Sequence, residues 1–231
     1  MRQMTGMTDL PILYSFRRCP YAMRARLAIL ASGQSVELRE IVLRDKAPEF
    51  LEASPSATVP CLKHGASVLD ESLDIMLWAL ERSDPEVWLQ PEEGDRETMF
   101  SLIEECDGPF KRHLDRYKYD TRYQDANKQE ERASASVFLR KLNDRLQGRA
   151  WLFGSRPSLA DYAILPFVRQ FANADRAWFD AEDWTALIEW LKAFEASERF
   201  QTIMPKWEKW HSGDAPVVFP VVLEKKTATT R

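Results

Sequence analysis

The sequence of 231 residues has few cysteines, few glycines and no excess of positive charge. Its three cysteines are an odd and sparse number, which argues against a disulfide framework and favours a reducing, cytoplasmic environment. Lys and Arg number 32 against 36 Asp and Glu, so the net charge of −4 disfavours a nucleic-acid partner. No apolar run approaches the roughly 20 residues of a membrane-spanning helix, so no membrane partner is expected.

Several motifs of common enzyme classes are also absent. The chain has no G-x-G-x-x-G, Walker-type loop, H-E-x-x-H or G-x-S-x-G sequence. Dinucleotide-binding, nucleoside-triphosphatase, zinc-protease and serine-hydrolase functions therefore lack their starting residues. The three histidines are scattered along the sequence, and no metal is expected as a cofactor.

Strand and helix patterns alternate over roughly the first third of the chain. Short apolar runs and apolar–polar alternation predict strands, and apolar residues at helical spacing predict helices. The expected order is β-α-β-α-β-β-α. The predicted strands cover 12–16, 36–39, 58–62 and 67–69, and the predicted helices begin after Cys19, at Pro48 and near Ser72.

The chain is predicted to contain two domains and a tail. Residues 9–84 form the α/β domain, and the proline- and acid-rich segment 85–95 is interpreted as a linker. Strand patterns are lacking over 96–212, where amphipathic windows predict an all-helical domain. These windows are 96–120, 127–147, 158–174 and 183–210. The prolines of the tail, 213–231, favour an extended segment lying on the body.

The third helical window carries two local signals. Ser158 and Asp161 are spaced as in a capping box, with Asp where Glu or Gln is usual. Pro166 lies inside the window and is expected to kink the helix or loosen one turn.

Cys19 is the foremost candidate for chemistry. It lies between a predicted strand and a predicted helix, and Pro20 occupies the first helical position. Unpaired amides and the helix dipole stabilise an anion there, so such thiols often have a pKa of roughly 3.5 to 7.5. Arg17, Arg18 and Arg24 add positive charge. The pattern predicts a nucleophilic thiolate at neutral pH, and the alternative is a small buried hydrophobic residue.

A second signal, Val59-Pro60, follows about 40 residues later. A proline at the start of a strand cannot occupy a paired interior position. If the peptide bond is cis, the backbone of Val59 is free to pair with an extended ligand.

Four short motifs follow one another along the chain. They are Arg-Arg-Cys-Pro-Tyr-Ala at 17–22, Thr-Val-Pro at 58–60, Asp-Glu-Ser at 70–72 and Ser-Leu-Ala-Asp-Tyr at 158–162. In this order and spacing, the sequence from about Leu10 to Trp210 resembles a glutathione transferase. Its Cys-Pro-Tyr-Ala start is most similar to the cysteine-dependent, omega-like members. The resemblance implies a thioredoxin-like N-terminal domain followed by an all-α domain that supplies most of the second-substrate pocket.

The resemblance also implies a role for each matching residue. Cys19 takes the catalytic position, and glutathione, as co-substrate, is held by Lys46, Val59, Pro60, Glu71 and Ser72. The backbone of Val59 pairs with the cysteinyl part as an added strand would. Ser72 and its helix N-terminus receive the γ-glutamyl carboxylate, and Glu71 faces the ammonium group. Lys46 lies near the glycyl carboxylate. Taken singly, these residues are also explained as solvated charges or a helix cap.

Some positions depart from the family's pattern. Ser-Pro-Ser-Ala at 54–57 stands where many members carry Asn-Pro-x-Gly, so the loop is expected to bend differently. Cys61 replaces an aliphatic residue, and its side chain is expected to point into the core rather than to have a redox role. Cys106 lies beside Glu105 and Asp107, which raise a thiol pKa, and no chemistry is assigned to it.

Phe110, His113 and Tyr117 share one face of the first long helical window. The resemblance places such a helix beside the second substrate, so these residues are candidates for that pocket. Packing in the core or in a dimer interface explains an aromatic stripe equally well.

Position 22 is alanine, where Cys-x-x-Cys redox motifs have their second cysteine. Cys19 therefore has no resolving cysteine three residues later, and this determines which mechanism is expected. A monothiol route remains: Cys19 attacks a disulfide or another oxidised or electrophilic small molecule, and glutathione releases the resulting mixed disulfide. The resemblance implies a cytoplasmic homodimer with thiol transferase or dehydroascorbate-like reductase activity. The rival interpretation is a non-catalytic regulatory binding protein similar to the stringent starvation protein, because a fold does not fix a function.

Overall fold

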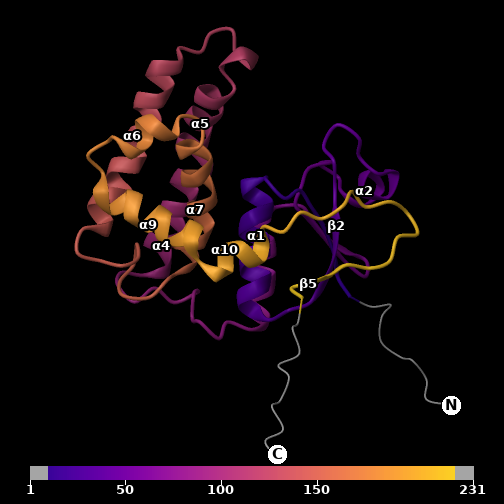
Figure 1. Ribbon diagram of the computed structural model, residues 1–231. Coiled ribbons are helices and arrows are strands. Elements are labelled where there is room, and N and C mark those ends of the chain that lie inside the picture. Colours follow the sequence, from indigo (N-terminus) through magenta and orange to yellow (C-terminus); the bar gives the residue numbers. More distant parts are fainter. Residues whose placement is uncertain (1–9, 222–231) are drawn as a thin grey trace, which may run out of the picture.

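The computed structural model describes residues 10–221, so residue 9 of the predicted first domain and residues 222–231 of the predicted tail lie outside the described range, as do residues 1–8. The described chain forms an α/β part followed by a helical part, as expected from the sequence. Figure 1 shows the long helix α1, Pro20–Ser32, standing between the sheet and the helical part. Helix α1 is therefore the element from which a site between the two parts is built.

A mixed sheet organises the N-terminal part. Within the described residues it has five strands in the order β4-β3-β1-β2-β5. Strand β1 pairs in parallel with β2, whereas β1–β3, β3–β4 and β2–β5 are antiparallel. The strands are β1 Ile12–Ser15, β2 Val36–Glu40, β3 Cys61–His64, β4 Ser67–Leu69 and β5 Val218–Phe219. The hairpin strand expected at 58 begins only at Cys61, after Pro60, which has no N–H to give to a ladder.

Helices cover both faces of this sheet. Helix α1 and helix α3, Ser72–Arg82, pack against one face in the main core. The other face carries a smaller cluster in which Tyr14 of β1 packs against Phe50 of helix α2, Pro48–Ala53. Helix α1 ends at Gly33, whose φ of 69° is a left-handed conformation that glycine adopts at low cost.

The helical part packs onto the exposed side of α1. Its helices are α4 Arg96–Glu105, α5 Lys111–Lys118, α6 Lys128–Leu146, α7 Leu159–Ala172, α8 Arg176–Asp180, α9 Thr185–Ala196 and α10 Glu198–Ile203, together with a short 3₁₀ turn, η2 Asp120–Arg122. Helices α7 and α10 contact α1 directly. The expected capping box of Ser158 and Asp161 is present at the start of α7, and α7 remains helical through Pro166.

The first helical window is not one α-helix. A π-helical segment, η1 Cys106–Phe110, separates α4 from α5 and contains Pro109. A wider turn tolerates a proline because it removes the regular i to i−4 pairing at that place. The interruption changes the rotational phase of α5 relative to α4. This phase determines which face of α5 lines the site.

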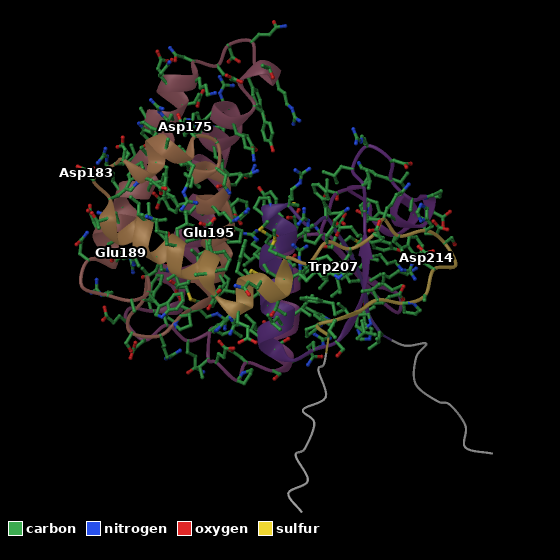
Figure 2. All side chains as sticks on the ribbon, viewed as in Figure 1. Asp175, Asp183, Glu189, Glu195, Trp207 and Asp214 are labelled. Atoms are coloured by element: carbon green, nitrogen blue, oxygen red, sulfur yellow. The ribbon has the colours of Figure 1, made fainter. Side chains whose placement is uncertain are left out.

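The chain returns from the helical part to the sheet after α10. Trp207 lies beside α1 in Figure 2, and the Arg26 guanidinium lies 5.5 Å from the centre of its ring. The N–H of Trp210 then donates to the Glu40 carbonyl over 2.9 Å. Beyond this point β5 adds to the edge of β2. None of the helices between residues 10 and 221 combines the length and apolar character of a membrane-spanning segment.

Candidate active site

Cys19 is the N-cap of α1. Its backbone is extended, at φ −71° and ψ 124°, and Pro20 is the first helical residue, as predicted. The half-buried thiol donates to the Val59 carbonyl over 3.6 Å between sulfur and oxygen. The structure therefore brings together two residues that are 40 positions apart in the sequence.

The expected lowering of the Cys19 pKa is not found. Burial raises the pKa of the thiol above its ordinary value. The amides of Ala22 and Tyr21 and the charges of Arg26 and Lys111 act in the opposite direction without overcoming burial. Because desolvation disfavours the anion more than the helix start favours it, the prediction of a thiolate at neutral pH was wrong.

Val59 offers its backbone to the space beside Cys19. The Val59–Pro60 bond is cis, and β3 begins only after it. Within residues 10–221, the Val59 N–H makes no hydrogen bond, and its carbonyl accepts only from the Cys19 thiol. Both groups are thus available to an extended peptide, as expected from the sequence.

The start of α3 lies near the buried guanidinium of Arg24, whose partners the sequence did not identify. Ser72 is the first residue of α3 and is 2% exposed, whereas Glu71 before it is exposed. The Arg24 Nε donates to the Ser72 Oγ over 2.9 Å, and its two terminal nitrogens donate to the Asp107 carboxylate over 2.7 and 2.8 Å. Arg24, which is predicted to add to the positive field around Cys19, links α3 to the helical part instead.

Lys46 and the loop after α2 lie where the sequence predicts contacts with the glycyl end of glutathione. Lys46 is half-buried two residues before α2, and no ion pair or hydrogen bond among the described residues holds its side chain. Asp70 accepts from the Ser54 hydroxyl and the Ser56 N–H, each over 2.7 Å. Ala57 has φ of 53°, a left-handed conformation that costs an alanine free energy. The loop therefore turns at the position where many family members carry glycine.

A buried arginine holds the loop in front of Cys19. Arg26 donates to the Ser15 hydroxyl over 2.5 Å, to the Arg17 carbonyl over 2.7 Å and to the Ile203 carbonyl over 3.0 Å. Glu40 accepts from the Arg17 N–H over 2.7 Å. Burial lowers the pKa of Arg26 to about 10, with Glu40 opposing that shift, so Arg26 remains charged at neutral pH.

A cavity of about 450 Å³ lies beside Cys19 between the two parts of the chain. From the N-terminal side it is lined by residues such as Phe16, Arg18 and Tyr21, and from α5 and the residue after it by Lys111, Asp115, Lys118 and Tyr119. The expected second-substrate residues do not line it. Phe110 and Tyr117 are each 1% exposed and lie in the hydrophobic core, so core packing accounts for those two aromatic residues.

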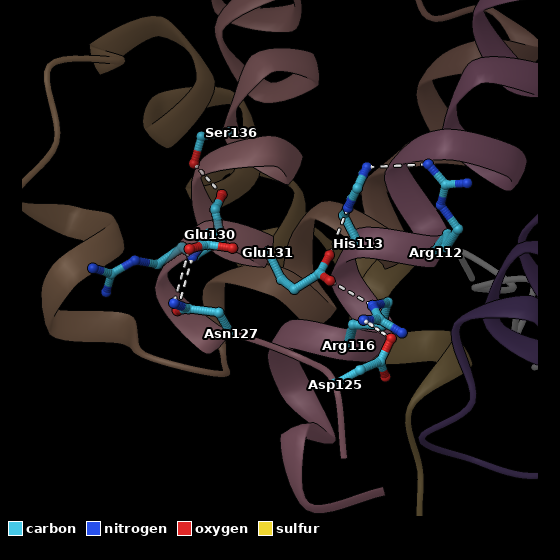
Figure 3. A network of polar contacts seen from close by, with 9 residues as sticks. Arg112, His113, Arg116, Asp125, Asn127, Glu130, Glu131 and Ser136 are labelled. Atoms are coloured by element: carbon cyan, nitrogen blue, oxygen red, sulfur yellow. Dashed lines mark hydrogen bonds and ion pairs between the residues drawn. The ribbon is translucent and has the colours of Figure 1, made fainter. Parts of the chain in front are cut away.

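His113 belongs to a separate ionic network, which Figure 3 shows. Its Nδ1 lies 2.6 Å from Glu131, and Arg116 bonds to Glu131 and to Asp125. Burial raises the pKa of Glu131, but bonds from Arg116 and His113 bring it below its ordinary value. The residues of α5 that face the Cys19 cavity are instead Lys111, Asp115 and Lys118, on the neighbouring face of the same helix.

The other two cysteines have no access to the cavity. Cys61 is fully buried, as expected, and burial with the nearby Asp70 raises its thiol pKa to about 12. Cys106 is also fully buried, and burial followed by the charge of Asp107 raises its pKa. Of the three thiols, only Cys19 faces a cavity.

The fold and the site define a class of protein: a thioredoxin-like domain with a thiol at the start of its first helix, joined to a helical domain that closes the other side of a cleft. Two family models match the chain in this order. The model of the glutathione S-transferase N-terminal domain matches residues 13–88, and that of the C-terminal domain matches 125–193. The chain belongs to the glutathione transferase superfamily.

Similar proteins cover most of the chain at low identity. Maleylacetoacetate isomerase of Rattus norvegicus is 26% identical over 84% of this chain and 92% of its own length. Glutathione S-transferase omega-1 of Mus musculus is 26% identical over 68% of this chain and 65% of its own length. A solved glutathione transferase family member from Pseudomonas fluorescens, with two glutathione molecules bound, has a TM-score of 0.74 and 18% identity, covering 87% of this chain and 95% of that one.

Proposed function

We propose that this protein is a cysteine-type, omega-like glutathione transferase that transfers thiols and reduces disulfides or dehydroascorbate-like compounds with glutathione. The observation that carries the proposal is the position of Cys19, whose sulfur lies 3.6 Å from the carbonyl of a Val59 backbone that is otherwise unpaired among the described residues. A tripeptide paired with Val59 brings its own sulfur next to Cys19. Backbone pairing of this kind places the ligand in register.

Glutathione has charged groups at both ends, and each has a partner in the proposal. The buried Ser72 at the start of α3 receives the γ-glutamyl carboxylate, and the exposed Glu71 faces the ammonium group. Lys46, ahead of α2, lies on the glycyl side. The Arg24–Ser72 bond fixes the hydroxyl at the helix start and leaves its proton free to donate to a carboxylate.

The chemical step is a pair of thiol–disulfide exchanges. Cys19 loses its proton to solvent, attacks the glutathionyl sulfur of a mixed disulfide and displaces the other thiolate, which takes up a proton. A second glutathione thiolate then attacks the Cys19–glutathione disulfide, releasing glutathione disulfide and regenerating Cys19. The amides of Tyr21 and Ala22 and the charges of Arg26 and Lys111 stabilise the thiolate as it forms. The monothiol route follows because position 22 is alanine.

The test is glutathione-dependent reduction of a small mixed disulfide by the wild type, Cys19→Ser and Cys61→Ala. We expect Cys19→Ser to lose more than about 100-fold in rate, since a hydroxyl cannot form the mixed disulfide. Cys61→Ala removes a thiol outside the cavity and should keep the rate. Equal rates for the wild type and Cys19→Ser exclude this mechanism. Absence of glutathione binding at millimolar concentration favours the regulatory binding protein instead.

A homodimer and a cytoplasmic location are further parts of the proposal. The sparse, unpaired cysteines suit a reducing compartment. Sedimentation equilibrium at micromolar concentration should give twice the chain mass of 26.8 kDa. A mass that stays at one chain over the whole concentration range contradicts the dimer.

A further inference from the structure

The walls of the Cys19 cavity concentrate positive charge in a protein whose net charge is −4. Arg18, Lys111 and Lys118 line the cavity, and Asp115 is the acidic residue among the residues that line it. Lys111 is 8% exposed and is ion-paired with Asp115. Arg18 and Lys118 have no ion pair among residues 10–221. Two cations, Arg18 and Lys118, therefore face this space without an ion-pair partner in the described chain.

A second cavity of about 290 Å³ adjoins the first. The two share the residues Arg18, Lys118 and Gln170, and the second adds Arg17 and Arg169. Arg17 has no ion pair within the described chain, whereas Arg169 lies 3.2 Å from Glu195, which also pairs with Arg176. The cationic surface thus continues from Cys19 over the loop before α1.

The cations lie close enough to act on one another. Burial lowers the pKa of Lys118, Asp115 opposes that shift, and Lys111, Arg169 and Arg18 lower it further. Repulsion of this kind is relieved when an anion enters. Some cations elsewhere are instead neutralised by ion pairs: Arg140, for example, pairs with Glu182 and Asp183. In Figure 2, Asp183 and Glu189 lie on the side of the helical part away from α1.

We propose that the cleft beside Cys19 selects second substrates that carry a negative charge, such as a carboxylate, on the group attached to the reacting sulfur. Lys118 and Arg18 receive that charge, and Lys111 contributes to the field from its pair with Asp115. The proposal rests on the proposed function and names the substrate class of the same site. Gln170 is a further polar contact, because its Oε1 is buried without a partner; rotated by 180°, its amide donates to an anion.

A matched series of unreactive ligands tests this selection. S-(2-Carboxyethyl)glutathione and S-(2-carbamoylethyl)glutathione have nearly the same shape and differ by one charge, and S-(2-aminoethyl)glutathione reverses the sign. We expect calorimetry to give about tenfold tighter binding for the carboxylate than for the amide, and the weakest binding for the amine. The preference should shrink at about 0.5 M salt, since screening weakens exposed charge pairs.

Variants of Lys118 and Arg18 test whether these two cations cause the preference for the carboxylate ligand. Lys118→Gln should reduce the tenfold preference to about threefold, and Lys118→Gln combined with Arg18→Gln should abolish it. Binding of the amide ligand should stay within about twofold, because its neutral group has no charge to pair. Lys141→Gln is the matched control, since Lys141 pairs with Glu105 on the surface and lines neither cavity.

The outcomes separate this inference from the proposed function. If the three ligands bind equally to the wild type, or if the double variant keeps the preference, the inference is wrong even if Cys19 is catalytic. If Cys19→Ser reduces disulfides as fast as the wild type but the carboxylate ligand still binds most tightly, the thiol mechanism is wrong and the charge selection stands. Failure of all three ligands to bind overturns both.

Discussion

The two walls of the cleft beside Cys19 differ in construction. The first wall consists of the loop before α1 and the first residues of that helix, and the second wall consists of α5. On the first wall the atoms offered to a ligand are held by backbone and by buried hydrogen bonds, as the Val59 carbonyl and the Arg26-bound loop show. On the second wall they are the ends of long side chains, Lys111, Asp115 and Lys118, spaced over two helical turns. The first wall fixes where a sulfur lies, and the second sets the electrostatic potential around it.

This difference separates two kinds of change. A substitution on the α5 wall changes charge without altering a backbone hydrogen bond, so it affects which ligand is preferred more than folding. A substitution among the bonds of the first wall disturbs the loop that carries Cys19. We therefore expect chemistry to depend on the first wall and specificity on the second.

Arg24 links the α/β part to the helical part, and its removal should have the largest effect on stability. Arg24→Met removes the bonds to Ser72 and both bonds to Asp107 and leaves that carboxylate, 27% exposed, without its cation. We expect a loss of about 3 kcal/mol in the free energy of unfolding, measured by urea denaturation. Arg140→Met, which breaks an exposed pair, should cost less than about 1 kcal/mol. Equal losses in the two variants contradict a special role for Arg24.

A substitution of the buried Asp161 tests the stability of the helical part alone. Its buried carboxylate accepts from the N–H of Leu152 and from the N–H and hydroxyl of Ser158, each over 2.8 Å. Asp161→Asn replaces one acceptor oxygen by a donor, and should lower the free energy of unfolding by about 2 kcal/mol at pH 7. Asp183→Asn, at an exposed position, should cost less than about 0.5 kcal/mol.

The cost of Asp161→Asn should depend on pH in a definite direction. Burial raises the pKa of Asp161 from its ordinary 3.8 to about 6, so the folded state binds a proton before the unfolded state does. The stability that this group contributes is fully present below about 3.8 and is lost as the pH rises through 6. The difference between wild type and variant should therefore grow as the pH falls from 7 to 4. A difference that shrinks over this range contradicts the raised pKa.

The pH dependence of the reactivity of the Cys19 thiol tests the account of the first wall. Because burial raises its pKa, the thiolate fraction at neutral pH is small and should rise about tenfold between pH 7 and 8. Iodoacetamide labelling, followed by mass spectrometry, should show that rise at Cys19 and no reaction at Cys61 or Cys106 in the folded protein. If the labelling rate of Cys19 is already constant above pH 7, the thiol has the lowered pKa that its position at the helix start predicts, and the effect of burial is contradicted.

Local signals predicted much of the first wall, and longer-range structure accounts for what was missed. The Cys19–Pro20 helix start and the Val59–Pro60 turn are each encoded within a few residues, so the sequence located them. The phase of α5 depends on the π-helical segment at Cys106–Phe110, which a regular period of 3.6 does not describe. Apolar spacing also marks the core face of a helix, as at Tyr117, whereas the cavity is lined by the polar face. The pKa of Cys19 depends on burial, which spacing does not measure.

The smallest expected effect concerns the loop that precedes Val59. Ala57 has φ of 53°, where a side chain costs about 1 kcal/mol and glycine costs little. Ala57→Gly relieves that cost but gives the unfolded chain more freedom, so the net gain in the free energy of unfolding should be about 0.5 kcal/mol. Ala193→Gly, at an exposed interior position of α9, should lower it by about 1 kcal/mol. Urea denaturation of both variants measures the difference in sign, and losses of similar size would show that position 57 does not favour glycine.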